Sequence, residues 1–93
     1  MNNEDFYLRM VSMIISEASF EQLQKSIGEN DLEEGFKAAH ALKGVSGNLS
    51  LTSLCQKAIE ITELLRSYME MDYSEMLQGI LDEKKILEDL INN

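Results

Sequence analysis

Apolar residues recur at every third or fourth position along most of the chain, which is the spacing of one face of an α-helix. This pattern predicts a first helix over about Asn3 to Ile15. A second helix opens where Ser19 and Gln22 resemble a capping box, and Gly28 is well placed to end it. The beginning of the chain is therefore predicted to form two consecutive helices.

The same periodicity predicts two helices in the middle of the chain. Asn30 or Asp31 can cap the third helix, which should run to about Asn48. Ser50 or Thr52 can start the fourth helix. Its apolar stripe consists of Leu51, Leu54, Cys55, Ala58, Ile61 and Leu65.

A fifth helix follows a break in the periodicity at about Glu70 to Tyr73, where Asp72 or Ser74 can cap it. Its apolar positions are Met76, Leu77, Ile80, Leu81, Leu87, Leu90 and Ile91. Amphipathic helices joined by short connections predict an all-α fold. We expect an antiparallel four-helix bundle with a short additional N-terminal helix, formed by residues 1–93 as a single domain.

Composition supports helices and narrows the range of partners. The chain has no proline and only five glycines, which favours uninterrupted helices. A formal net charge of −9 repels both nucleic acid and anionic lipid surfaces, so neither is an expected partner. No apolar run approaches the roughly 20 residues that span a bilayer, and no signal peptide opens the chain. We therefore expect a soluble, cytoplasmic, monomeric protein.

The cysteine and histidine content argues against metal chemistry. Cys55 is the single cysteine, and its place in an apolar helical stripe predicts a buried structural thiol. One cysteine and one histidine cannot form a spaced cluster of metal ligands. We expect no metal site and no cofactor on this chain.

The third predicted helix carries the one histidine of the chain, His40. At about 100° per residue, the apolar residues of this helix fall within about 60° of one another. This core stripe consists of Ala38, Leu42, Val45 and Leu49. Because His40 projects on the order of 180° away from the centre of the stripe, it should point to solvent.

The neighbours of His40 on this outer face combine positive charge with open space. They are Phe36, Lys37, Lys43, Gly44 and Gly47. Two glycines inside a helix cost about 2 kcal/mol relative to alanine, and clearance beside the imidazole is a physical reason to tolerate them. The two lysines can offer ammonium groups to a phosphoryl group, whose transfer depends mainly on positioning and charge stabilisation. An exposed imidazole is a suitable nucleophile near neutral pH, but an ordinary surface histidine also fits this pattern.

The stretch from Ala39 to Leu49 reads AHALKGVSGNL. It resembles the signature of histidine-containing phosphotransfer (HPt) domains, which is roughly A-H-x-L-K-G-x-x-x-x-L. The resemblance covers about Phe6 to Ile91, because the order and lengths of the predicted helices also agree. Ser50 stands where many members have a further glycine, and we expect it to alter only the turn after the motif.

The resemblance implies a four-helix bundle in which His40 is the phosphoacceptor and Lys43 stabilises the phosphoryl group. It also implies that Gly44 and Gly47 leave room for an incoming partner. That partner would be the receiver domain of a response regulator, alone or within a hybrid sensor histidine kinase. The transferred group would move to or from an aspartate of the receiver, and the magnesium ion would belong to the receiver.

Two other classes of function, a helical adaptor and a hydrolase, fit parts of this pattern. A helical adaptor could dock a signalling partner through the same face without chemistry, although such a surface has no need of the His, Lys and Gly combination. A hydrolase is disfavoured because no second acid or base gathers near His40. No nucleotide-binding segment is present, so we expect a phosphocarrier without autokinase activity. Phe36 could contribute to docking or lie buried under the first helix, and burial is the favoured prediction.

Overall fold

The computed structural model describes residues 9–13, 18–48 and 51–92, and it shows four packed helices in this part of the chain. They are α2 (Ala18–Gly28), α3 (Leu32–Asn48), α4 (Thr52–Arg66) and α5 (Ser74–Asn92). A short helical segment precedes them at residues 9–13. Because the described residues include no strand, the predicted all-α fold is confirmed.

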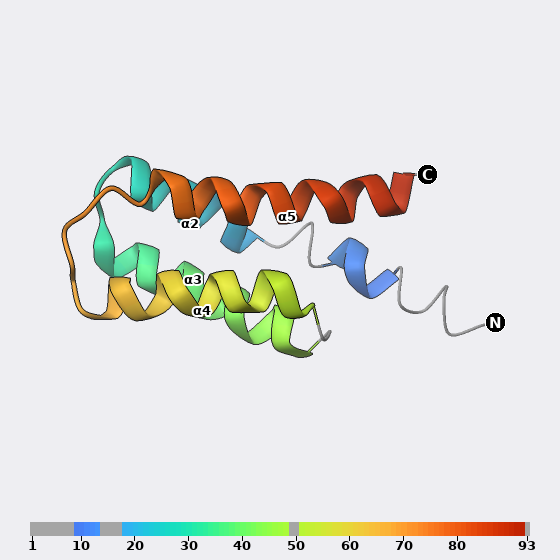
Figure 1. Cartoon of the computed structure of the whole chain (residues 1–93), viewed down its shortest axis with the longest axis horizontal. Coiled ribbons are helices and arrows are strands. Elements are labelled where there is room, and N and C mark those ends of the chain that lie inside the picture. Colours follow the sequence, from blue (N-terminus) through green and yellow to red (C-terminus); the bar gives the residue numbers. More distant parts are fainter. Residues whose placement is uncertain (1–8, 14–17, 49–50, 93) are drawn as a thin grey trace.

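The helices lie in two layers, with α2 beside α5 and α3 beside α4 (Figure 1). Helix α3 packs closely against both α2 and α4, whereas α5 makes sparser contacts with α4 and α2. The buried hydrophobic residues come from all four helices, the 9–13 segment and the loop before α5. They are Val11, Phe20, Leu23, Ala38, Ala39, Leu42, Leu54, Ala58, Ile61, Leu65, Tyr73, Ile80 and Leu87.

Several helix boundaries follow from short-range hydrogen bonds that the sequence predicts. Gly28 is the last residue of α2. The Glu34 amide donates to Oδ1 of Asp31 at 3.2 Å, which caps the start of α3. The Ser74 amide donates to Oδ1 of Asp72 at 2.9 Å immediately before α5. Local polar side chains therefore set where α3 and α5 begin.

The predicted start of α2 differs from the structure, whereas that of α4 agrees with it. Helix α2 already includes Ala18, so Ser19 lies inside the helix and the predicted capping box at this residue is wrong. Helix α4 begins at Thr52, one of the two predicted starting residues, although its N-cap is Leu51 and makes no side-chain cap bond. Ser50 lies outside the described residues, as does most of the predicted first helix.

The buried face of α3 is broader than the predicted stripe. Ala39 and Ser46 are fully buried, while Val45 is only half-buried. The cause is that α3 packs against neighbours on two sides, so a wider arc of the helix is covered. Leu90 of α5 is also a correction, because its side chain is 52% exposed where the sequence predicts a core position. Figure 1 shows α5 extending past the start of α4, so the last turns of α5 have no such partner.

Candidate functional site: an exposed histidine on α3

His40 is exposed on the outer face of α3, as the helical periodicity predicts. Its chain neighbour Ala39 and, two positions on, Leu42 are both fully buried in the core. The core therefore fixes the rotation of α3 about its axis and turns the imidazole to solvent. A nucleophile placed in this way can be reached directly by another protein.

Phe36, one helical turn before His40, packs its ring beside the imidazole. The two ring centroids are 5.8 Å apart with an interplanar angle of 44°, within the range of favourable aromatic pairs. Phe36 is half-buried against the core. The favoured prediction of burial is met only in part, and the Arg66 guanidinium of α4 lies over the ring. Most of the predicted first helix lies outside the described residues.

The two lysines of the motif helix are placed differently. The Lys37 ammonium pairs with the Glu34 carboxylate at 3.3 Å, and this hydrogen bond raises the pKa of Lys37 above its ordinary value. Because Glu34 lies toward the start of α3, this contact draws the ammonium away from His40 along the helix. Lys43 is half-exposed one turn after His40. Lys43 is thus the better placed of the two to meet a group carried on the imidazole.

The glycines leave the surface beside His40 open. A Cβ atom at Gly44 would have no neighbour within 4 Å, so the packing of α3 does not require glycine there. At Gly47 an added Cβ would meet Sγ of Cys55 at 3.7 Å, which is ordinary van der Waals contact. Close packing among the described residues therefore explains neither glycine.

Helix α4 adds residues to this face that the sequence analysis does not assign to it. The Cys55 thiol donates to the Lys43 carbonyl with an Sγ–O distance of 3.7 Å. Cys55 is half-buried, so the predicted burial of its thiol is only partial. Ile59 follows one turn later, on the same edge of α4, and is 41% exposed. This edge of α4 therefore carries an exposed aliphatic side chain between the two contacts that Cys55 and Arg66 make with α3.

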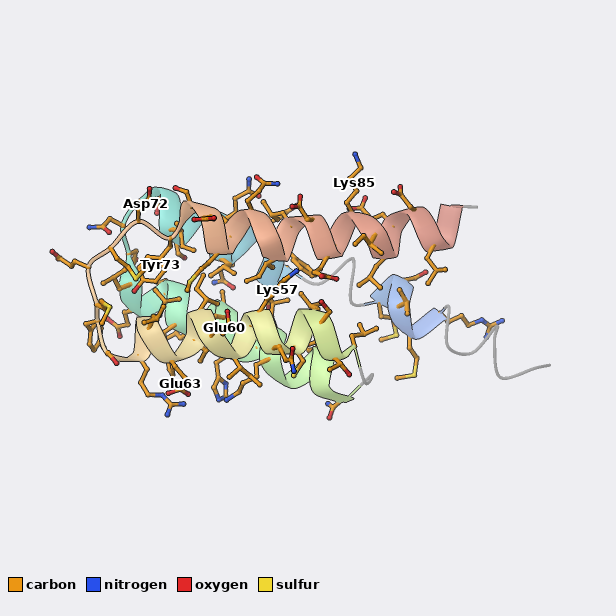
Figure 2. The ribbon with its side chains drawn as sticks, viewed as in Figure 1. Lys57, Glu60, Glu63, Asp72, Tyr73 and Lys85 are labelled. Atoms are coloured by element: carbon orange, nitrogen blue, oxygen red, sulfur yellow. The ribbon has the colours of Figure 1, made fainter. Side chains whose placement is uncertain are left out.

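Arg66 completes the α4 contribution at the far end of the helix. Its Cζ atom lies 5.7 Å from the centroid of the Phe36 ring, within the distance of a cation–π contact. A guanidinium nitrogen also lies 3.5 Å from Oε1 of Glu63, which Figure 2 shows on the outer side of α4. Spacings of four and seven residues, one and two helical turns, relate Cys55, Ile59 and Arg66 within α4. From the sequence, this spacing could have identified a shared edge of α4. It could not have shown that the edge lies beside α3.

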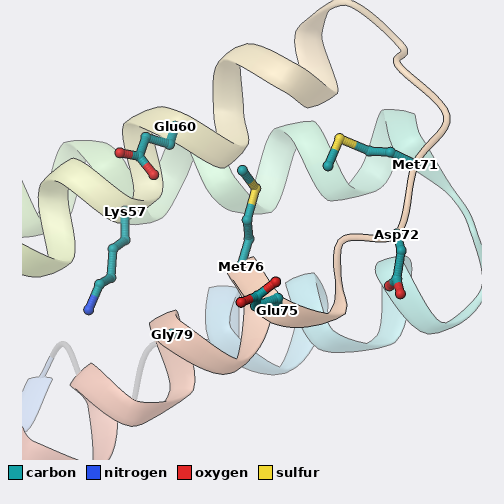
Figure 3. Close-up of a pocket in the computed structure, with 7 residues that line it drawn as sticks. All are labelled: Lys57, Glu60, Met71, Asp72, Glu75, Met76 and Gly79. Carbon is teal, nitrogen blue, oxygen red and sulfur yellow. The ribbon is translucent and has the colours of Figure 1, made fainter.

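The opposite edge of α4 borders a separate hollow of about 350 Å³ between α4 and α5 (Figure 3). It is lined by Lys57, Glu60, Met71, Asp72, Glu75, Met76 and Gly79. Beside it, the Lys57 ammonium donates to Glu83 Oε1 at 2.7 Å, and the Ser53 hydroxyl donates to the same atom at 2.7 Å. These bonds lower the pKa of Glu83 below its ordinary value. Neither His40 nor its neighbours on α3 line this hollow.

The described residues contain no group of three or more His, Cys, Asp or Glu side chains that could hold a metal ion. No helix in the same part of the chain is long and apolar enough to cross a membrane. The chemistry available at the site is that of one accessible imidazole, with a nearby ammonium on Lys43.

Comparison with protein-family models gives one assignment. The model described as "Hpt domain" matches residues 10–93, a span that contains α2 to α5. No curated protein and no solved structure matches the chain. The match therefore covers nearly the whole chain, including the helix that carries His40.

Proposed function

The chain belongs to the Hpt domain family, and we propose that it carries a phosphoryl group on His40 and exchanges it with an aspartate of a response-regulator receiver domain. Hpt domains are phosphotransfer domains of phosphorelays and are not kinases. They generally relay phosphoryl groups to receiver domains. The observation that carries the proposal is the exposed imidazole of His40 with open space at Gly44 one turn away.

The transfer needs only one nucleophile on this chain. A lone pair of the His40 imidazole attacks the phosphorus of the receiver's aspartyl phosphate. A nitrogen–phosphorus bond forms, the phosphorus–oxygen bond breaks and the aspartate carboxylate leaves. The reverse reaction returns the group to an aspartate. The Lys43 ammonium stabilises the negative charge of the phosphoryl oxygens, and the magnesium ion is supplied by the receiver.

The docking surface surrounds the imidazole on both helices. Phe36 and Ile59 supply partly exposed apolar area, and Gly44 and Gly47 allow the receiver to approach the helix backbone. Lys37 lies at the edge of this surface, already paired with an acidic side chain. Its role is to add positive charge to the approach path in a chain whose net charge is −9.

The proposal is tested by mixing the protein with a phosphorylated receiver domain and following intact mass. Wild type should gain one phosphoryl group that is labile to acid and stable to alkali, and His40→Gln should gain none. Circular dichroism should show the same helix content and melting temperature for both proteins, because His40 is exposed. Lys43→Ala should slow the transfer without abolishing it. If a folded wild type takes no group from several receivers, the adaptor function takes the place of this proposal.

A further inference from the structure

We propose that Arg66 of α4 is a positioning residue that orients the imidazole of His40 through the ring of Phe36. This inference rests on the proposed function, in which His40 is the phosphoacceptor. It concerns a residue from a different helix, 26 positions along the chain from His40. Its basis is a line of contacts that crosses from α4 to α3.

The contacts join three groups in a line of neighbours, with the Phe36 and His40 rings tilted by 44°. The Arg66 guanidinium lies 5.7 Å from the centroid of the Phe36 ring, and that centroid lies 5.8 Å from the centroid of the His40 imidazole. Phe36 is half-buried and packs against the core, so its ring has a fixed base. Arg66 restricts the exposed part of this ring from the α4 side. The ring in turn limits the orientations that the imidazole can adopt.

Orientation matters because His40 is exposed. An imidazole on a helix surface has rotational freedom about two side-chain bonds, and attack on phosphorus requires its nitrogen to point along one line. A neighbouring aromatic ring that holds the imidazole near a productive orientation lowers the entropy lost at reaction. The structure offers no enclosing pocket wall for this purpose among the residues described around His40. The Phe36 ring is the group that supplies the constraint.

The position of Arg66 over the Phe36 ring does not depend mainly on its ion pair with Glu63. Its partner Glu63 is 55% exposed at a distance of 3.5 Å, and exposed pairs of this kind contribute little. Arginine at the end of α4 is also favoured by the helix dipole. A planar guanidinium stacks on an aromatic face in a way that the lysine ammonium cannot reproduce fully. Arg66→Lys should therefore keep part of the constraint on the Phe36 ring, and Arg66→Met should keep none of it.

The experiment separates orientation from docking by using a small donor. Phosphoramidate transfers its phosphoryl group directly to the imidazole: its phosphorus–nitrogen bond breaks, a new one forms to His40, and ammonia leaves. No receiver takes part, so a change in rate cannot arise from lost contacts with a partner. The rate is followed by intact mass, and the His40 ring protons are followed by nuclear magnetic resonance.

We expect Arg66→Met to slow this reaction about threefold, the size of one exposed cation–π contact. The His40 ring protons should move toward the shifts of a free histidine, because the Phe36 ring current no longer acts on a fixed geometry. Phe36→Leu should have a similar effect. The double variant should be no slower than Phe36→Leu alone, since both residues act through the same ring.

Two control variants change the charge of the protein while leaving the Arg66 guanidinium in place. Lys85→Met removes a positive charge from an exposed position on α5, and Glu63→Gln removes the ion pair while leaving Arg66 over the ring (Figure 2). Neither should alter the rate or the His40 ring shifts. Melting temperatures of all variants identify any loss of fold.

The outcomes distinguish this inference from the proposed function. If wild type reacts and Arg66→Met has the same rate and the same His40 ring shifts, Arg66 is not a positioning residue. Additive effects of Arg66→Met and Phe36→Leu would also overturn it. If wild type reacts with phosphoramidate but takes no group from any receiver, the proposed function fails while the orientation of His40 by Arg66 stands.

Discussion

The two edges of α4 meet their neighbours by different means. Toward α3, the contacts are a guanidinium over a ring and a thiol against a carbonyl, made by Arg66 and Cys55. Toward α5, Lys57 and Ser53 both donate to one carboxylate oxygen of Glu83. Charges on the α5 side are used to join two helices, whereas those on the α3 side remain partly available to solvent. The α5 edge of α4 thus holds two helices together, and we call it the attachment side. The α3 edge leaves functional groups exposed beside α3, and we call it, with the exposed face of α3, the display side.

This division has a physical origin in packing. Helices α3 and α4 pack closely through the core, so their contact does not depend on ion pairs. Helix α5 contacts α4 more sparsely and leaves an open hollow beside Lys57 (Figure 3). A charge-assisted network there compensates for limited apolar contact. Substitutions on the two edges should therefore change different measured properties.

The largest effect is expected on the display side, from Gly44→Gln. The added side chain enters the space that a docking receiver needs, so transfer from a phosphorylated receiver should fall by about tenfold or more, equivalent to about 1.4 kcal/mol. Stability should rise by about 0.5–1 kcal/mol, because glycine is unfavourable inside a helix. Rapid-quench transfer assays and urea unfolding measure the two quantities.

Gly28→Gln provides the matched control, because an added Cβ at this glycine also meets nothing within 4 Å and the residue lies at the end of α2. It should leave transfer unchanged. Unaltered transfer by Gly44→Gln would show that the receiver does not approach this part of α3.

The next largest effect is expected on the attachment side, from Lys57→Met. The Glu83 side chain is 17% exposed and loses one of its two donors, the charged one. We expect a loss of about 1 kcal/mol of unfolding free energy, a value that allows for the 40% exposure of Lys57. Phosphotransfer should stay at the wild-type rate. A slower transfer with unchanged stability would contradict the division between the two edges.

The smallest expected effect is the dependence of this attachment on pH. The pKa of Glu83 is lowered in the folded state by its hydrogen bonds from Lys57 and Ser53. The stabilisation is therefore fully present above the unfolded-state value of 4.5 and is lost as pH falls through the folded-state pKa. Urea unfolding between pH 7 and pH 3 should show this loss. Below about pH 4.5, Lys57→Met should reduce the slope of the unfolding free energy against pH. Identical slopes in the two proteins would rule out this contribution.

Periodicity within one helix predicts what faces outward, and for that reason the exposure of His40 and Gly44 follows from the sequence. The cap at Asp31 also follows, because a cap depends on residues three positions apart. The burial of Ala39 does not follow, since it depends on how many neighbours cover α3. Contacts between helices, such as Arg66 over Phe36, depend on the relative placement of two elements, which no pattern within either element specifies.

The exposure of His40 has a consequence for the lifetime of a phosphoryl group carried on it. A phosphohistidine on this face would stand in water, because the His40 side chain is exposed among the residues that the structure describes. Its lifetime would then be set by the chemistry of the nitrogen–phosphorus bond and by encounters with receivers. The concentration of those receivers, more than any motion within this domain, would decide how quickly the signal moves on.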